Sequence, residues 1–261
     1  MPPRPDSSGW IVCPQPRPAA LVRLFCFPYA GGSASLFREW SAFFPREIEV
    51  CAIQLPGREN RLAEPPLSEF EPLVQRLADA ISPYLDKPCA FFGHSLGALV
   101  SFELARFLRQ REGFCPVRLL VSAHRAPQLP DPHPPVYDLP LPEFLQTLRG
   151  LQGTPEEILH HEELMQLLLP TLRADFTLAE TYRYVPDEPL ACPCSAFGGL
   201  RDSHVSRAEL AAWQQQTSST FLVRMFPGDH FFLHSDRMLL VRAIADELSG
   251  YLYRHTDSQH A

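Results

Sequence analysis

The sequence contains no long uninterrupted apolar run and no excess of basic residues. No stretch approaches the length of a membrane span, and Met1 to Gly9 is polar and proline-containing, without the apolar core of a secretory signal. The 23 basic residues are outnumbered by 30 acidic ones, which gives a formal net charge of −7. Such a charge offers no overall field to attract nucleic acid or an anionic membrane. We therefore expect neither as a partner, and we predict a cytoplasmic protein.

The cysteines do not have the spacing of a metal site. The seven cysteines are an odd number, and several fall within predicted buried strands, where a thiol packs as a small apolar group. Cys192 and Cys194 form the one tempting pair, but a single residue separates them, unlike the Cys-x-x-Cys spacing of zinc and thioredoxin-like sites. We interpret both as core residues of a strand, and we expect no metal and no cofactor.

Apolar stretches with the character of strands alternate with segments of helical spacing along most of the chain. The 261 residues, 45% of them hydrophobic, are enough for one large core. The alternation predicts an α/β fold, with a mostly parallel sheet and helices on both faces, formed by residues 1–261 as a single domain. The predicted strands are residues 21–27, 49–55, 88–92, 117–123, 191–197 and 221–226, and the clearest helices follow residues 67 and 95 and close the chain at about 236–253.

One segment, from about residue 125 to 188, breaks this alternation. Residues 127–142 include seven prolines, which cannot donate to a sheet ladder, so this stretch belongs outside the core. Thr154 to Glu157 predicts a capped helix start, Pro170 is expected to end that helix, and a further helix is predicted over residues 172–184. We predict a helical lid over an active site; a passive cover for the edge of the core is the alternative.

A Gly-x-Ser-x-Gly motif, Gly93 to Gly97, joins a predicted strand directly to a predicted helix. The turn between them is too tight for Cβ atoms at the two glycines, and it holds Ser95 in a strained conformation that exposes its hydroxyl. At the start of a helix, the dipole and the free N–H of Leu96 favour a developing negative charge. The motif therefore predicts a nucleophilic serine, against the alternative of a glycine-rich turn without chemistry.

A second glycine-rich loop, Pro28 to Gly32, follows the first long strand. Paired glycines let the backbone approach a ligand closely and direct amide groups toward it. Ser33 is expected to cap a helix that runs through Leu36 and Trp40. A plain strand-to-helix turn is the alternative for this loop.

A base and an orienting acid are expected later in the chain, because serine hydrolases built on such a sheet have the order Ser, Asp, His. Asp202 follows the strand that ends at residue 197, and His230 follows the strand that ends at residue 226. Both would lie at the carboxyl ends of parallel strands, at the same edge as Ser95. The rivals are His124 for the base, and Asp229 and Asp236 for the acid.

Four motifs, taken together, resemble those of the type II thioesterases. They are Phe27-Pro28-Tyr29-Ala30-Gly31-Gly32, Leu55-Pro56-Gly57-Arg58-Glu59, Phe92-Gly93-His94-Ser95-Leu96-Gly97 and Gly228-Asp229-His230-Phe231-Phe232-Leu233. The resemblance extends from Leu21 to about Leu252. Type II thioesterases are stand-alone α/β-hydrolases that serve non-ribosomal peptide and polyketide synthases, and medium-chain acyl-carrier-protein thioesterases are related to them.

The resemblance implies a catalytic triad of Ser95, Asp202 and His230, with the amides of Ala30 and Leu96 as the oxyanion hole. It also implies hydrolysis of acyl groups from the phosphopantetheine arm of acyl- or peptidyl-carrier proteins, which would edit stalled or misprimed synthases. The residues that we expect to bind the acyl group are Tyr29, Met165, Phe176 and Phe231. We expect a monomer. A small-ester or lipase-like hydrolase and a catalytically inactive hydrolase-fold binding protein are the alternatives.

Overall fold

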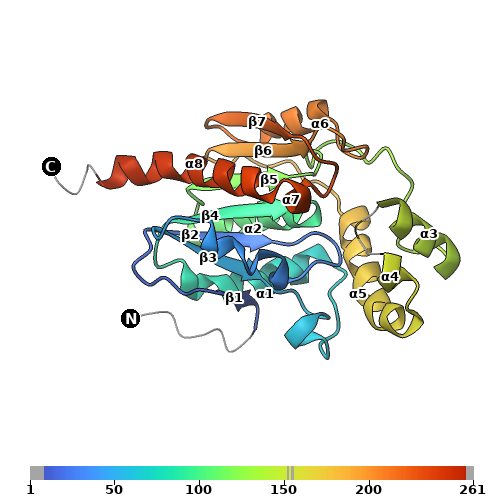
Figure 1. The fold of residues 1–261 in the computed structure, drawn as a ribbon. Coiled ribbons are helices and arrows are strands. Elements are labelled where there is room, and N and C mark those ends of the chain that lie inside the picture. The colour runs from blue at the N-terminus through green and yellow to red at the C-terminus, as the bar shows by residue number, and fades with distance from the viewer. Residues whose placement is uncertain (1–8, 152, 154–155, 257–261) are drawn as a thin grey trace.

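The computed structural model describes residues 9–151, 153 and 156–256, with side chains as far as residue 252 (Figure 1). Within these residues, a seven-stranded sheet has the order β1-β3-β2-β4-β5-β6-β7. β1 pairs antiparallel with β3, and the other neighbours are parallel, as predicted. The strands are β1 (Ile11–Val12), β2 (Val22–Phe27), β3 (Ile48–Ile53), β4 (Cys89–His94), β5 (Arg118–Ser122), β6 (Cys194–Gly199) and β7 (Phe221–Phe226).

Helices cover both faces of the sheet, which explains why the central strands are mostly apolar. Every residue of β2, β3, β4 and β6 is buried, as expected for parallel strands packed on both sides. The helices α1 (Phe70–Ile81) and α2 (Leu96–Glu112) share one apolar cluster with strand residues, to which α6 (Arg207–Ala211) also contributes. The opposite face packs against α7 (Phe232–Ser235), α8 (Arg237–Thr256) and the two 3₁₀ turns η1 (Ala34–Phe37) and η2 (Trp40–Ala42).

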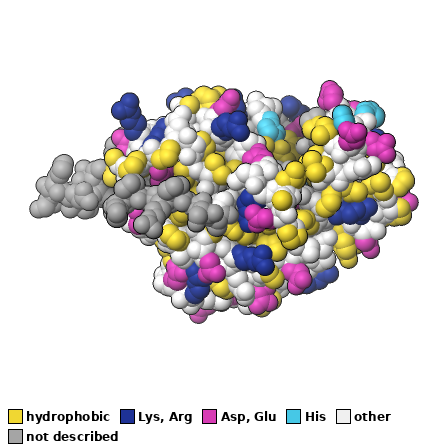
Figure 2. All heavy atoms as spheres, turned by 90° about the horizontal axis from the view of Figure 1, so that it is seen from below, with side chains coloured by type: hydrophobic (Ala, Val, Ile, Leu, Met, Phe, Trp, Pro, Cys, Tyr) yellow, Lys and Arg dark blue, Asp and Glu magenta, His cyan; other side chains and the backbone are white. Residues whose placement is uncertain are grey.

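Between β5 and β6, the described residues form three helices that lie together at one end of the sheet, on the right in Figure 1. They are α3 (Leu141–Leu151), α4 (Glu156–Leu159) and α5 (Glu162–Thr181). A small apolar cluster of their own includes Phe144, Leu148 and Met165. Figure 2 shows several hydrophobic side chains on the surface at this side of the molecule. Leu164 and Leu167 of α5 are exposed. We call residues 125–188 the insertion.

Two predictions about helix ends were wrong. Pro170 does not end a helix, because α5 continues through it from Glu162 to Thr181. Buried contacts on the far side of the proline, at Leu172 and Asp175, hold α5 against the rest of the molecule and outweigh the loss of one helical hydrogen bond. Ser33 does not cap a helix; its hydroxyl donates to Glu59 Oε1 (2.6 Å), and two short 3₁₀ turns follow it. The predicted cap at Thr154 and Pro155 lies outside the described residues.

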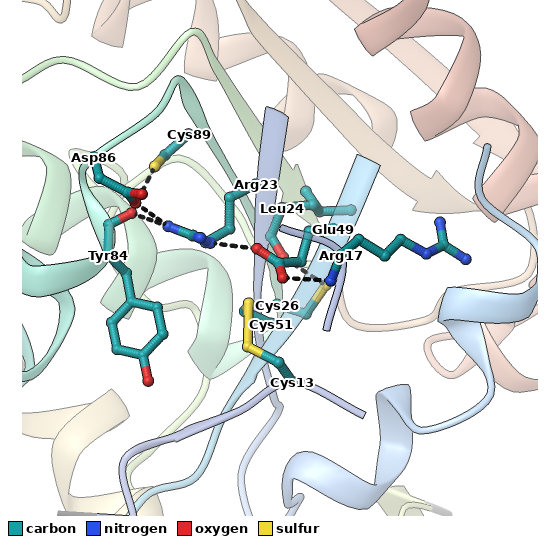
Figure 3. Close-up of a disulfide and its surroundings, with 10 residues drawn as sticks. All are labelled: Cys13, Arg17, Arg23, Leu24, Cys26, Glu49, Cys51, Tyr84, Asp86 and Cys89. Atoms are coloured by element: carbon teal, nitrogen blue, oxygen red, sulfur yellow. Dashed lines mark hydrogen bonds and ion pairs between the residues drawn. A yellow bond between two sulfur atoms is a disulfide. The ribbon is translucent and has the colours of Figure 1, made fainter. Parts of the chain in front are cut away.

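A disulfide joins Cys13, which follows β1, to Cys51 in β3 (Figure 3). This pair was not predicted, because the cysteines were interpreted only as small core residues. The strand β1, which brings Cys13 beside β3, was not predicted either. That interpretation does hold for Cys26, Cys89, Cys192 and Cys194, which are free and buried. Among the described residues, no helix is both long and apolar enough to cross a membrane.

Candidate active site

The turn from β4 into α2 brings three backbone segments into close contact around Ser95. Ser95 has φ 53° and ψ −120°, a conformation that an L-residue adopts only under strain. A Cβ on Gly93 would lie 2.1 Å from Gly97 O, and a Cβ on Gly97 would lie 2.2 Å from Phe27 O. Both glycines are therefore required by close approach, and the predicted geometry of the motif is confirmed.

Three side chains from different strand ends form one line of hydrogen bonds. His230 Nε2 lies 3.2 Å from Ser95 Oγ, and His230 Nδ1 lies 2.9 Å from Asp202 Oδ2. The Asp202 side chain is fully buried, whereas 14% of the His230 side chain is exposed. The structure thus brings together the three residues that the sequence analysis selected, at the carboxyl edge of the sheet.

Asp202 is held as a carboxylate despite its burial. Burial raises its pKa, but the hydrogen bond and charge of His230 and the backbone amides of His204 and Val205 outweigh that effect and lower it. Those amides donate to Asp202 Oδ1 over 2.8 Å and 3.1 Å. The ionised Asp202 accepts a hydrogen bond from His230 Nδ1–H, which keeps the proton on Nδ1. The lone pair of Nε2 then faces Ser95.

The rival residues have other partners in the structure. Asp229 Oδ1 accepts from Phe231 N (2.8 Å), and Asp236 Oδ2 accepts from Ser235 Oγ (2.6 Å). His124 lines the same cavity as Ser95, but its Nδ1 donates to Arg125 O (2.6 Å). Among the described residues, His230 is the one acid or base whose side chain contacts the Ser95 hydroxyl.

His94 is a buried residue to which the sequence analysis gave no role. Its Nε2 donates to the backbone carbonyl of His230 (3.0 Å), so its Nδ1 must accept from Ser122 Oγ (2.9 Å). Burial, followed by the charges of His230 and His234, lowers the pKa of His94 well below its usual value. A neutral His94 therefore holds the backbone of the base. Its position beside the serine was the only available signal in the sequence.

Ala30 and Leu96, whose backbone amides are the predicted oxyanion donors, line the same cavity as Ser95. Within the described part of the chain, neither amide donates a hydrogen bond to another backbone or side-chain group. Two such amides beside a nucleophile can stabilise a tetrahedral oxyanion. Both residues predicted to form the oxyanion hole therefore line the cavity that contains the nucleophile.

The cavity over Ser95 has a volume of about 400 Å³ and is bordered by the insertion. Tyr29, Phe176 and Phe231 line it, as expected for substrate-binding residues. Met165 does not line it, which corrects that prediction; its side chain is buried with Phe144 in the cluster between the insertion helices. The insertion contributes further apolar lining from Pro134, Val136, Leu148, Leu151, Leu172 and Ala179.

Polar side chains also line the cavity. Arg125 and Asp131 form an ion pair there (2.6 Å), and His133 and His204 lie close together. Neither here nor elsewhere among the described residues do three or more His, Cys, Asp or Glu side chains form a group that could hold a metal ion. The cavity is thus lined by both apolar and polar side chains.

The order of serine, acid and base along the chain, at the carboxyl edge of a mostly parallel sheet, places the molecule among the α/β-hydrolases. Comparison with known proteins narrows this class. A model of the thioesterase domain matches residues 22–249. The chain therefore belongs to the thioesterase family.

Individual relatives agree with this assignment. Gramicidin S biosynthesis protein GrsT of Aneurinibacillus migulanus is 51% identical over 92% of this chain and 93% of its own. The solved structure of the type II thioesterase BorB, from the borrelidin biosynthetic cluster, has a TM-score of 0.84 at 39% identity and covers 92% of this chain and 97% of its own. The medium-chain S-acyl fatty acid synthase thioesterase of Rattus norvegicus is 31% identical over 88% of each chain. The predicted resemblance to type II thioesterases is confirmed.

Proposed function

We propose that the chain hydrolyses acyl thioesters held on the phosphopantetheine arm of acyl- or peptidyl-carrier proteins. The observation that carries the proposal is the line of hydrogen bonds from Asp202 through His230 to Ser95, which ends at a largely apolar cavity. GrsT is named for gramicidin S biosynthesis and BorB for a borrelidin cluster. Those names support a role beside a synthase, where the chain would clear stalled or misprimed acyl groups as a cytoplasmic monomer.

The first half of the proposed reaction forms an acyl-enzyme. His230 Nε2 takes the proton of Ser95 Oγ as that oxygen attacks the thioester carbonyl. The amides of Ala30 and Leu96 stabilise the oxyanion, and Asp202 stabilises the imidazolium through Nδ1. Collapse of the intermediate breaks the carbon–sulfur bond, and His230 returns its proton to the leaving thiol.

The second half releases a carboxylic acid. Water enters in place of the thiol, and His230 takes its proton while the oxygen attacks the acyl-enzyme carbonyl. The same two amides hold the second oxyanion, and Ser95 leaves with the proton from His230. In this proposal the whole chain is one domain, and the insertion serves as a lid whose wall, with Tyr29, Phe176 and Phe231, contacts the acyl chain.

Mass spectrometry of carrier domains loaded with different acyl groups tests the proposal. Wild-type enzyme should reduce each carrier's mass by its acyl group, whereas Ser95→Ala should leave it unchanged, because losing the nucleophile of a comparable triad lowers kcat by about a million-fold. Faster hydrolysis of small free esters than of carrier thioesters would favour a small-ester hydrolase. Failure of a fluorophosphonate to label Ser95 would favour an inactive binding protein.

A further inference from the structure

The loop that carries the Ala30 amide is fastened to the insertion by a buried carboxylate. We call residues Pro28 to Gly32 the oxyanion loop. Asp175, on α5, accepts a hydrogen bond from the backbone amide of Gly31 through Oδ2 (2.7 Å), and its side chain is 1% exposed. A residue 144 positions away in the chain therefore fixes the peptide group that directly follows Ala30.

Arg58 completes this attachment from a third segment. Its guanidinium donates through Nη1 to Asp175 Oδ2 and through Nη2 to Asp175 Oδ1, both over 2.8 Å. The same Nη1 donates to the carbonyl of Gly32 (2.9 Å), and the Arg58 side chain is 5% exposed. A paired fork of this kind fixes orientation as well as distance. The loop after β3, the oxyanion loop and α5 thus meet at one ion pair.

The backbone hydrogen bonds of the oxyanion loop link the orientation of the Ala30 amide to the ion pair. Tyr29 O accepts from Gly32 N (2.8 Å), and in a planar trans peptide the N–H of Ala30 points opposite to that carbonyl. Gly32 is itself held by Arg58, so the Tyr29–Ala30 peptide depends on the ion pair through one hydrogen bond.

α5 also packs closely against the oxyanion loop. A Cβ on Gly31, which has φ +77°, would lie 2.6 Å from Leu172 Cδ2. Thr171 lies one turn before Asp175 on α5. Its hydroxyl donates to the carbonyl of Gly57 (2.6 Å), the residue that precedes Arg58. The contact between α5 and the two loops is therefore tight on both sides of the ion pair.

We propose that the Arg58–Asp175 pair is a positioning device that holds the Ala30 amide in the oxyanion hole and couples the insertion to the chemical step. The inference rests on the proposed function, because it takes the Ala30 amide as an oxyanion donor. Through the Arg58–Asp175 pair, α5 becomes a structural part of the active site. A residue of the insertion then affects kcat and not only the affinity for the acyl chain.

Asp175→Asn is the first test. The substitution keeps the shape of the side chain and an oxygen for one donor, but it removes the charge that orients Arg58. We expect kcat to fall by about 10- to 100-fold, less than the roughly 100- to 1,000-fold typical of losing one oxyanion donor outright. KM should stay unchanged, and the fall in kcat should be equal for acetyl- and octanoyl-carriers, because the acyl wall is untouched.

Glu49→Gln is the matched control, since Glu49 is also a buried carboxylate that accepts from an arginine and from a backbone amide. Its partners are Arg23 Nε (2.8 Å) and Arg17 N (2.7 Å), near the amino ends of β2 and β3 and away from the site (Figure 3). Glu49→Gln should lower the unfolding temperature, as Asp175→Asn does, while leaving kcat unchanged. All rates are divided by the fraction of Ser95 that a fluorophosphonate labels at completion, so that unfolded protein does not count.

The double variant Arg58→Met/Asp175→Leu separates positioning from stability. It leaves no unpaired buried charge, and replacing a buried ion pair by apolar residues is often neutral for stability. A positioning role predicts that kcat per labelled site stays low even when the unfolding temperature recovers. Recovery of kcat together with stability, or wild-type kcat in Asp175→Asn, would overturn the inference alone. A wild-type enzyme that neither labels nor hydrolyses carrier thioesters would overturn the proposed function instead.

Discussion

At the scale of single residues, the choice of Asp202 as the orienting acid can be tested by an isosteric change. Asp202→Asn should give a folded protein whose kcat is roughly ten-thousand-fold lower, because the imidazole of His230 would then be held in the wrong tautomer. Asp229→Asn and Asp236→Asn are the controls, since their carboxylates bind Phe231 N and Ser235 Oγ. Steady-state kinetics on an acyl-carrier substrate would decide. Loss of activity in either control, with Asp202→Asn near wild type, would show that the acid is misassigned.

The residues that the sequence identified are those whose chemistry is tied to a local motif or to the end of a strand. Ser95 and His230 each belong to a short motif, and Asp202 follows from the order of groups along the chain. Asp175 could not be found in this way, because its partners Arg58 and Gly31 are more than a hundred residues away. Long-range pairs of this kind depend on how α5 docks, which no local pattern records.

Met165 shows how a correct face can still give a wrong site. Leu172, Phe176 and Ala179 line the cavity at helical spacing along α5, and Met165 lies two turns before Leu172 on the same face. The cavity ends before that point, and the side chain packs into the cluster of the insertion helices instead. Periodicity predicts the face of a helix but not how far along it a pocket extends.

At the scale of elements, the junction of β4 and α2 should tolerate no added methyl group. Gly97→Ala should lower the free energy of unfolding by about 1–3 kcal/mol, the usual cost of overpacking, because its Cβ would meet Phe27 O. Gly150→Ala is the control: nothing lies within 4 Å of its Cβ, and alanine in a helix should add up to about 1 kcal/mol. Urea unfolding measures both. Wild-type stability and activity in Gly97→Ala would show that the strand and the helix can separate.

Strands were easier to predict than the ends of helices. Strands buried on both faces are apolar at most positions, so β2, β3 and β4 stand out from the chain around them. β1 is only two residues long and is defined by its pairing with β3, which leaves no periodic signal. The continuation of α5 through Pro170 likewise depends on tertiary contacts and not on local propensity.

The wall that α5 presents to the cavity should select the acyl chain. Phe176→Asp should raise KM for an octanoyl-carrier about tenfold more than for an acetyl-carrier, since two lost methylene contacts at about 0.8 kcal/mol each suffice. Met165→Glu should instead lower stability with little change in this ratio, because Met165 is buried away from the cavity. The exposed Leu164→Asp serves as the control for added charge on α5. Equal losses on both substrates in Phe176→Asp would mean that acyl selection occurs elsewhere.

At the scale of the whole molecule, several histidines are kept neutral by the fold. Burial lowers the pKa of His94 well below its usual value and lowers that of His124 to about 4, with help from the charge of Arg125 at His124. Burial also lowers the pKa values of His204 and His234. These groups lie around one edge of the sheet, so their protonation opposes the folded arrangement of the whole site.

The stability of the molecule should therefore fall as the pH drops from about 6.5 toward 4. Below pH 6.5 the unfolded chain binds protons at these imidazoles, whereas the folded chain binds them only at lower pH. Because the unfolded state carries more protons in this range, the free energy of unfolding rises with pH and is lost as the pH falls. Urea unfolding at a series of pH values would measure the slope. His124→Asn should make this slope shallower. An unchanged slope in His124→Asn would show that His124 is protonated as readily in the folded chain as in the unfolded one.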